Sequence, residues 1–405
     1  MDLKRILFVD DEPLVLQGLQ RMLRGLRREW TMEFAGSGEK ALALMEKEPF
    51  DAVISDMRMP GMNGAQLLAE VMRLHPRTIR IILSGHADKD LILQCMGATH
   101  QYLTKPCDPD ALKAVVRRAT HLDYLRQHKR LTALVGQMQH VPTIPALYSA
   151  MVKALNDPNA SIEEVAALVS RDIGMTARIL KLVNSAFFGL GRPIADTAEA
   201  VNHLGFDVIK SLALALDTFG QLRVNAAVGV RLDEVFAHSV AVSNCARMIA
   251  HAEGADRKSQ DEAFVSGLLH DVGKIILLAN LPDDMQRAAA FAKERKKLDF
   301  ECEREIFGAD HAAVGGYLLG LWGLPVPVVE AVALHHTPAS GTAEAFSPLT
   351  AVHAANAVVT GSDLILNLGP DALLDPKFLS GLGLLDRFDN WRASWLESMA
   401  APASS

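Results

Sequence analysis

In the first third of the chain, carboxylates, a hydroxyl and an amine each follow a short apolar run. Asp10 and Asp11 follow "ILFV", Asp56 follows "DAVIS", Ser84 follows "IRIIL", and Lys105 follows "QYLT". Three carboxylates gathered in one crevice repel each other, and a hard cation such as Mg²⁺ relieves the repulsion because it prefers oxygen ligands. These residue types therefore predict a divalent-cation site with a hydroxyl and a lysine opposite.

A second set of reactive side chains lies further along, around "LLHDVGK" at residues 268–274. Imidazoles bind transition metals and carboxylates balance their charge, so such a set could polarise a phosphodiester and activate a water molecule. Carbonyls or hydroxyls could equally satisfy buried histidines, and Asp271 could cap a helix or pair with Lys274. The candidate residues are His238, His270, Asp271, His311, His335, His336 and Asn356.

Alternating strands and helices are expected to position the first set. Between residues 6 and 118, β-rich apolar runs alternate with amphipathic patterns such as "GAQLLAEVMRL". This alternation predicts a doubly wound, five-stranded parallel sheet, whose working site lies at the carboxyl ends of the strands. The acidic residues fall at those ends.

The rest of the chain is predicted to be helical. A stretch without glycine or proline from Asp110 to Val135 predicts one long connecting helix, whose basic residues we interpret as a solvated face. After residue 141 strand patterns almost disappear, Ser161 with Glu164 predicts a capping box, and Asp172 with Gly174 indicates a turn between two helices. This part is expected to be an all-α domain.

Composition narrows the function classes. The 405 residues allow two or three domains, and the net charge of −7 argues against bulk binding to nucleic acid. No apolar run reaches the ~20 residues of a membrane span, and acidic residues interrupt the N-terminus, which is unlike a secretory signal. The four cysteines are scattered, which is typical of free thiols in a reducing cytoplasm. We therefore expect a cytoplasmic protein.

The first 120 residues resemble the receiver domain of two-component response regulators. The resemblance rests on the acidic pair Asp10-Asp11, the run "DMRMPGMNG" from Asp56, "LSGHAD" and "YLTKP". It implies that a partner histidine kinase phosphorylates Asp56.

The same resemblance assigns the other roles in this domain. It implies that Asp10, Asp11, Asp56 and the backbone carbonyl of Arg58 hold Mg²⁺, with Asp10 acting through water. Ser84 and Lys105 would contact the phosphoryl oxygens, and Tyr102 would be the switch aromatic. The Lys105–Pro106 bond is expected to be cis.

Residues 140–340 resemble the HDOD domain, a regulatory branch of the HD hydrolase superfamily. Segments in matching order include "ARILKLVNSAFFG", "GLLHDVGK" and "AVALHH". Asn356 stands where the superfamily has its terminal metal-binding aspartate, and the Gly-Tyr-Pro signature of the HD-GYP phosphodiesterases is missing. Asp271 is then the one carboxylate among the mapped ligands. We therefore favour a vestigial or structural cluster, metal-free or with one weakly bound ion, over a catalytic metal centre.

Together these patterns predict a receiver at 1–120, a helical linker at 121–138, an HDOD domain at 139–340 and a helical extension with a frayed tail at 341–405. The predicted function is a response regulator that transmits phosphorylation of Asp56 to a non-catalytic HDOD domain, which binds an unidentified signalling partner. The alternative is a phosphorylation-gated, metal-dependent phosphohydrolase acting on a cyclic dinucleotide or nucleotide. A homodimer is compatible with the sequence, and neither a membrane nor nucleic acid is expected as a partner.

Overall fold

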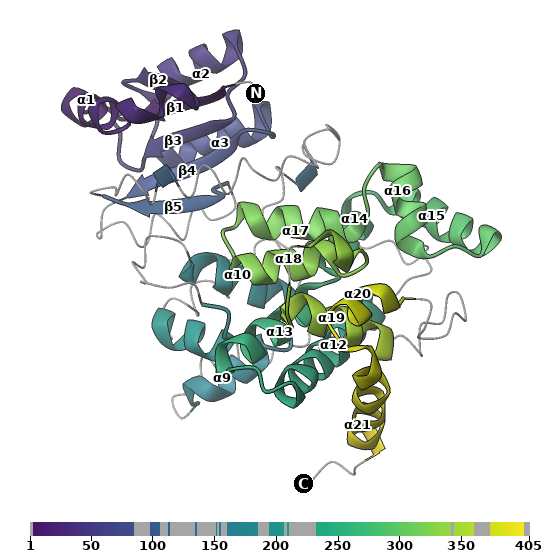
Figure 1. Ribbon diagram of the computed structural model, residues 1–405. Helices are drawn as coiled ribbons and strands as arrows, with labels where there is room; N and C mark the ends of the chain where they lie inside the picture. Colours follow the sequence, from purple (N-terminus) through teal and green to yellow (C-terminus); the bar gives the residue numbers. More distant parts are fainter. Residues whose placement is uncertain are drawn as a thin grey trace.

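The computed structural model of the chain describes residues 3–84, 98–105, 112–113, 134–135, 151, 154, 160–184, 194–205, 209, 232–341, 344–359 and 373–400 (Figure 1). The long connecting helix expected between Asp110 and Val135 lies outside these residues, apart from the helical pairs 112–113 and 134–135. Cys95, Cys107 and Pro106 also lie outside them.

The N-terminal domain is built on a five-stranded parallel sheet, as predicted. The strand order is β2-β1-β3-β4-β5. The central strands are buried on both faces because helices cover the sheet, which explains their almost wholly apolar sequences. The strands are β1 (Lys4–Val9), β2 (Trp30–Ala35), β3 (Ala52–Asp56), β4 (Ile79–Ser84) and β5 (Gln101–Thr104).

The described helices of this domain are α1 (Pro13–Met22), α2 (Gly38–Lys47) and α3 (Gly64–Leu74). Asn63 and Gln66 form a capping box that fixes the start of α3. α1 ends at Met22, and a 3₁₀ turn, Arg24–Arg28, follows it. Gly25 lies in that turn, where its low helix propensity favours the break.

The second domain is helical throughout its described residues. Ser161 caps α9 by accepting a hydrogen bond from the Glu164 amide, which is one of the two hydrogen bonds of the predicted capping box. Asp172 lies between α9 and α10, where a turn was predicted, and caps α10 through the Met175 amide, whereas Gly174 lies within α10. The helices are α9 (Ile162–Val169), α10 (Ile173–Val183), α12 (Leu232–Ala252), α13 (Arg257–Leu269), α14 (Val272–Asn280), α15 (Pro282–Arg295), α16 (Asp299–Phe307), α17 (His311–Leu321), α18 (Val326–Leu334), α19 (Pro348–Val359), α20 (Pro376–Gly381) and α21 (Phe388–Ala400).

Two buried apolar clusters form the interior. The larger one runs from the sheet into α10, α13, α14 and α17, so the two domains share continuous apolar contact. The smaller one joins α12, α19 and the C-terminal helices. In the described part of the chain no single helix has the length and apolarity to cross a membrane, although Arg257–Asn280 and Pro282–Arg295 meet those criteria as a bent pair.

Candidate functional site

The acidic residues of the first domain meet at one edge of the sheet. Asp10 directly follows β1, and Asp56 is the last residue of β3 rather than the first one after it. Lys105, directly after β5, places its Nζ 2.7 Å from Asp10 Oδ2 and 2.5 Å from Asp56 Oδ1. Because β1 and β3 are neighbours, the two carboxylates converge on the same ammonium group.

Asp56 is held from both of its oxygens. Lys105 contacts Oδ1, and the Arg58 amide donates to Oδ2 at 3.1 Å. Burial raises the pKa of Asp56 above its ordinary value, although the hydrogen bond from Lys105 opposes that shift. Burial lowers the pKa of Lys105, but its hydrogen bonds to Asp10 and Asp56 outweigh this and the net shift is upward. Lys105 therefore stays charged, and its contact only partly offsets the cost of burying the charged form of Asp56.

The backbone beside Asp56 requires a glycine. A Cβ on Gly64, the first residue of α3, would overlap the carbonyl oxygen of Asp56. Only glycine lets the start of α3 approach the strand end this closely. The glycine of "DMRMPGMNG" that begins α3 therefore shapes the wall of the site.

A buried hydroxyl stands beside the acidic edge. Ser84 is the last residue of β4, is fully buried, and its Oγ has no hydrogen-bond partner among the described residues. Its strand neighbour in β5 is Thr104, one residue before Lys105. An unsatisfied buried hydroxyl is costly, so an acceptor arriving at this edge would be stabilised by it.

The remaining predicted residues of this domain lie nearby. Asp11 follows Asp10 and is half-buried, and Tyr102 in β5 has its side chain buried at 1% exposure. All the predicted side-chain ligands are carboxylates, so the donor set fits a hard cation such as Mg²⁺. The use of the Arg58 carbonyl as a ligand stays a prediction.

The seven candidate residues of the second domain come together between helices. His270 and Asp271 form the junction of α13 and α14, His311 begins α17, and His335 with His336 follows α18. His238 on α12 and Asn356 on α19 close the other side, with His238 Nε2 3.0 Å from Asn356 Oδ1. The candidate ligand atoms fall into two groups, and within each group all of them lie within 4.8 Å of one another. One group consists of His238, His270 and Asp271, and the other of His311, His335 and His336.

Backbone carbonyls orient two of the buried imidazoles. His270 Nδ1 lies 2.7 Å from the Gly267 oxygen, and His335 Nδ1 lies 2.8 Å from the Val332 oxygen. Both Nε2 atoms are buried and have no hydrogen-bond partner within the described ranges. Burial lowers the pKa of His270 to about 4 and that of His335 well below its ordinary value, so both are neutral near pH 7.

His311 lies between two buried carboxylates. Its Nε2 is 3.1 Å from Asp271 Oδ1, and its Nδ1 is 2.6 Å from Glu303 Oε2. Burial lowers the pKa of His311, but Glu303 and Asp271 outweigh it and raise that pKa to about 9. Lys274 adds a second cation at 3.0 Å from Asp271 Oδ2. Two carboxylates thus face two cations inside the cluster.

Glu303 is a second buried carboxylate beside this cluster, which the sequence analysis did not identify. It lies on α16, is 1% exposed, and also accepts a hydrogen bond from the His311 amide at 2.7 Å. Burial raises the pKa of Glu303, but His311 outweighs this and the net shift is downward. Its position eight residues before His311, across a helix break at Gly308, was the signal available in the sequence.

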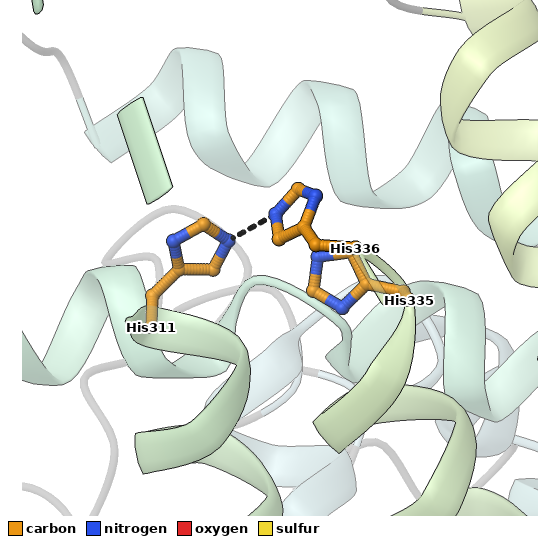
Figure 2. A group of neighbouring side chains, drawn as sticks. All are labelled: His311, His335 and His336. Atoms are coloured by element: carbon orange, nitrogen blue, oxygen red, sulfur yellow. Dashed lines mark hydrogen bonds between the residues drawn. The ribbon is translucent and has the colours of Figure 1, made fainter. Parts of the chain in front are cut away.

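His336 completes one side of the cluster. Its Nε2 lies 3.0 Å from His311 Nε2, and Figure 2 shows the two rings with these nitrogens facing each other beside His335. The His336 ring also stacks on Phe300 at a centroid distance of 4.2 Å. Burial lowers the pKa of His336 well below its ordinary value, so it can accept a hydrogen bond from protonated His311.

The glycine of "LLHDVGK" has a structural role. A Cβ on Gly273 in α14 would overlap the His311 carbonyl oxygen, so glycine allows the start of α17 to lie against α14. This contact brings His311 to Asp271.

The fold consists of an α/β domain with an acidic edge, followed by a helical domain that holds a cluster of histidines. Residues 6–117 match the family model of the response regulator receiver domain, and residues 141–338 match that of the HDOD domain. The chain belongs to the response regulators that carry a receiver domain and an HDOD domain.

Several known proteins are similar to parts of the chain. The hydrogenase transcriptional regulatory protein HoxA of Cupriavidus necator is 31% identical over 41% of this chain and 37% of its own length. The DNA-binding transcriptional regulator NtrC of Salmonella typhimurium is 28% identical over 66% of this chain and 63% of its own. The chain therefore spans less than two thirds of the length of these curated relatives.

Two solved structures are also similar. The MmoQ response regulator of Methylococcus capsulatus is 24% identical and is matched over 63% of this chain and 97% of that one, with a TM-score of 0.46. An HDOD domain protein of unknown function from Geobacter sulfurreducens is 23% identical over 69% of this chain and 95% of that one, with a TM-score of 0.39.

Proposed function

We propose that a histidine kinase phosphorylates this response regulator on Asp56, and that the HDOD domain passes the resulting switch to a signalling partner. The observation that carries the proposal is the contact of Lys105 with both Asp10 and Asp56, beside the buried and unsatisfied hydroxyl of Ser84. An ammonium and a hydroxyl placed at one carboxylate can bind the phosphoryl oxygens that arrive on it.

A metal ion belongs to this proposal. Asp10, Asp11, Asp56 and the Arg58 carbonyl are the proposed ligands of Mg²⁺, which would neutralise charge that develops on the transferred phosphoryl group. In this proposal Asp56 is the nucleophile and Lys105 pairs with a phosphoryl oxygen. Ser84 donates a hydrogen bond to another phosphoryl oxygen. The charge added at Asp56 then favours a second arrangement of the domain, in which Tyr102 follows Ser84.

Labelling with a small phosphodonor tests the assignment. The full chain is treated with phosphoramidate and Mg²⁺, and the added phosphoryl group is measured by intact mass and peptide mapping. Asp56→Asn should abolish labelling. Asp51→Asn, just before β3 at its opposite end, is the matched control and should label like the wild type. Labelling that persists in Asp56→Asn refutes the assignment.

For the histidine cluster we propose a structural role, with the HDOD domain acting as a binding module. The support is the internal balance of charge, with Lys274 and protonated His311 facing Asp271 and Glu303. A protonated His311 has no lone pair for a metal, and Lys274 already neutralises Asp271. His311 would have to lose its proton, or Lys274 its contact with Asp271, before a metal could bind tightly.

A metal-dependent phosphohydrolase is the second candidate. The observation in its favour is the pair of three-residue ligand groups, with His270 Nε2 and His335 Nε2 unsatisfied among the described residues. Elemental analysis of the purified chain decides between the two. One or more transition-metal ions per chain, lost in His270→Ala together with phosphodiesterase turnover, would overturn the structural role.

A further inference from the structure

Buried polar groups of three elements meet where the receiver contacts the HDOD domain. The elements are α10, the end of α17 and the segment that leads into β5, and Figure 1 shows β5 on the side of the sheet that faces the two helices. Lys181 Nζ of α10 donates to the Thr99 carbonyl at 2.7 Å and lies 4.8 Å from the centroid of the Trp322 ring. Beside it, Gln101 Nε2 donates to the Leu321 carbonyl at 3.1 Å.

The two residues that Lys181 contacts each keep a polar atom without a partner. Thr99 Oγ1 and Trp322 Nε1 are buried and have no hydrogen-bond partner among the described residues. Their side chains are 0% and 1% exposed, so bulk water does not reach them. An indole N–H can only donate, and a hydroxyl can donate as well as accept. Unsatisfied buried donors are unfavourable, and their gathering at one ammonium indicates that an acceptor belongs there.

Arg178 adds a guanidinium without a counter-ion. It precedes Lys181 by three residues in α10, so the two side chains lie on the same face of that helix. Arg178 is 9% exposed, and its Nε has no hydrogen-bond partner in the described part of the chain. Burial lowers the pKa of Arg178 to about 10, and no described carboxylate opposes that shift. Buried charges in proteins are normally paired, so an anion is missing at Arg178. We call Arg178, Lys181, Thr99 and Trp322 the boundary cluster.

The charges around the boundary cluster are positive as well. Burial lowers the pKa of His100 well below its ordinary value, and the cations Arg80 and Lys181 lower it further. Burial also lowers the pKa of Arg80 to about 9, and the described group that opposes this shift is the phenol of Tyr317, not a carboxylate. A water molecule could accept a hydrogen bond here, but it would bring no charge. The local potential therefore favours an anion.

Apolar side chains enclose the boundary cluster. The continuous apolar cluster that joins the two domains includes its neighbours on all three elements, which are Ala98, Ile179, Leu182 and Leu321. In such surroundings an interaction between opposite charges is stronger than in water. Apolar contact thus holds the domains together, and an anion bound within it would add to that contact.

We propose that the boundary cluster binds a small oxyanion, such as inorganic phosphate or acetate, between the receiver and the HDOD domain. Arg178 and Lys181 supply the positive charge, and Trp322 Nε1 and Thr99 Oγ1 donate hydrogen bonds to the oxygens of the ion. Ligand sites occur preferentially at such domain interfaces. Because both domains contribute to the site, the bound ion stabilises their docked arrangement. The inference does not depend on phosphorylation of Asp56.

Equilibrium dialysis of the full chain against radiolabelled inorganic phosphate tests the site. The buffer contains EDTA, so that no Mg²⁺ brings phosphate to the acidic edge of the receiver, and chloride keeps the ionic strength constant. Binding should saturate at one phosphate per chain. Phosphate should also raise the midpoint of thermal unfolding, because it binds the folded chain alone. A parallel series with acetate separates a tetrahedral ligand from a carboxylate, and binding of either one supports the proposal.

Arg178→Met removes the guanidinium and keeps most of its apolar length. The variant should bind the ion at least about tenfold more weakly, because it loses charge-assisted hydrogen bonds. In phosphate-free buffer it should be no less stable than the wild type, since the charge removed is buried and unpaired. Arg171→Met, an exposed change just before α10, is the matched control and should bind like the wild type. A lower unfolding midpoint of Arg178→Met without phosphate would overturn the proposal, because it would mean that a protein group already satisfies Arg178.

Thr99→Val provides a second test that does not depend on the folding of Arg178→Met. It removes the unpartnered hydroxyl and keeps the backbone carbonyl that holds Lys181. The variant should bind the ion about fivefold more weakly, the loss expected for one neutral hydrogen bond, with no fall of the unfolding midpoint in phosphate-free buffer. Equal affinity in the wild type, Arg178→Met and Thr99→Val would mean an adventitious ion only, and refutes the site. Failure of both phosphate and acetate to bind the wild type refutes it as well.

Discussion

The buried pair of Glu303 and His311 should make the stability of the HDOD domain depend on pH between 6.5 and 9. Glu303 and Asp271 raise the pKa of His311 from 6.5 to about 9 in the folded chain. A folded-state pKa above the unfolded one means that the extra stability is fully present below pH 6.5. It is lost as the pH rises through about 9.

The magnitude follows from the shift. A displacement from 6.5 to about 9 corresponds to about 3–4 kcal/mol of unfolding free energy, because each unit of pKa is worth about 1.4 kcal/mol. Glu303→Gln removes the carboxylate that makes the largest contribution to raising this pKa. The variant should therefore be about 3 kcal/mol less stable than the wild type below pH 6.5, in the range measured for breaking a buried ion pair.

Urea unfolding of the full chain, followed by far-ultraviolet circular dichroism at a series of pH values, measures this difference. Subtracting the variant curve from the wild-type curve cancels the groups that the two proteins share. The difference in unfolding free energy between the wild type and Glu303→Gln should decrease as the pH rises through about 9. Glu305→Gln, an exposed change on the same helix, is the matched control and should leave the wild-type slope intact. Parallel curves for wild type and Glu303→Gln across this window would refute the charge assignment at His311.

Four further substitutions test local features of the structure. Gly273→Ala should cost about 1–3 kcal/mol in thermal or urea unfolding, because its Cβ overlaps the first residue of α17. Gly18→Ala, which meets nothing within 4 Å in the middle of α1, should instead stabilise by about 0.5–1 kcal/mol. Asp310→Ala should cost about 1–2 kcal/mol, since its Oδ1 caps α17. Ser84→Ala should not lower the unfolding free energy, because it removes a buried hydroxyl that has no hydrogen-bond partner within the described structure, yet it should slow phosphorylation of Asp56 by phosphoramidate.

The fold and the acidic edge of the receiver domain could be predicted from local sequence patterns. The interiors of β1, β3 and β4 are short, almost wholly apolar runs, because burial on both faces of a parallel sheet leaves little choice of residue type. The carboxyl ends of such strands must meet at one edge, so the convergence of Asp10, Asp56 and Lys105 could be predicted without coordinates. Ser161 also marked a helix start correctly, because a cap acts within one helical turn, and the turn predicted at Asp172 separates α9 from α10.

Only the tertiary structure decided the state of the histidine cluster. The sequence placed His270, Asp271 and His311 near one another but missed Glu303, because a helix presents its side chains in every direction and the sequence does not say which one faces a distant histidine. The charge of His311 depends on two carboxylates from separate helices. Electrostatic energy in a buried site varies with distances of a few ångströms, and such distances are properties of the packed fold.

The hydrogen bonds between the two domains were likewise decided by the tertiary structure. Lys181 and Gln101 are 80 residues apart in the chain, and neither stands out in the sequence as a partner of the other domain. Their role arises because docking buries a lysine and a glutamine where each finds a backbone carbonyl of the other domain. A backbone carbonyl carries no residue identity, so contacts of this kind leave no pattern in the sequence. The residues at the acidic edge of the receiver were thus predictable from sequence, whereas the hydrogen bonds between the receiver and the HDOD domain became visible only in the folded chain.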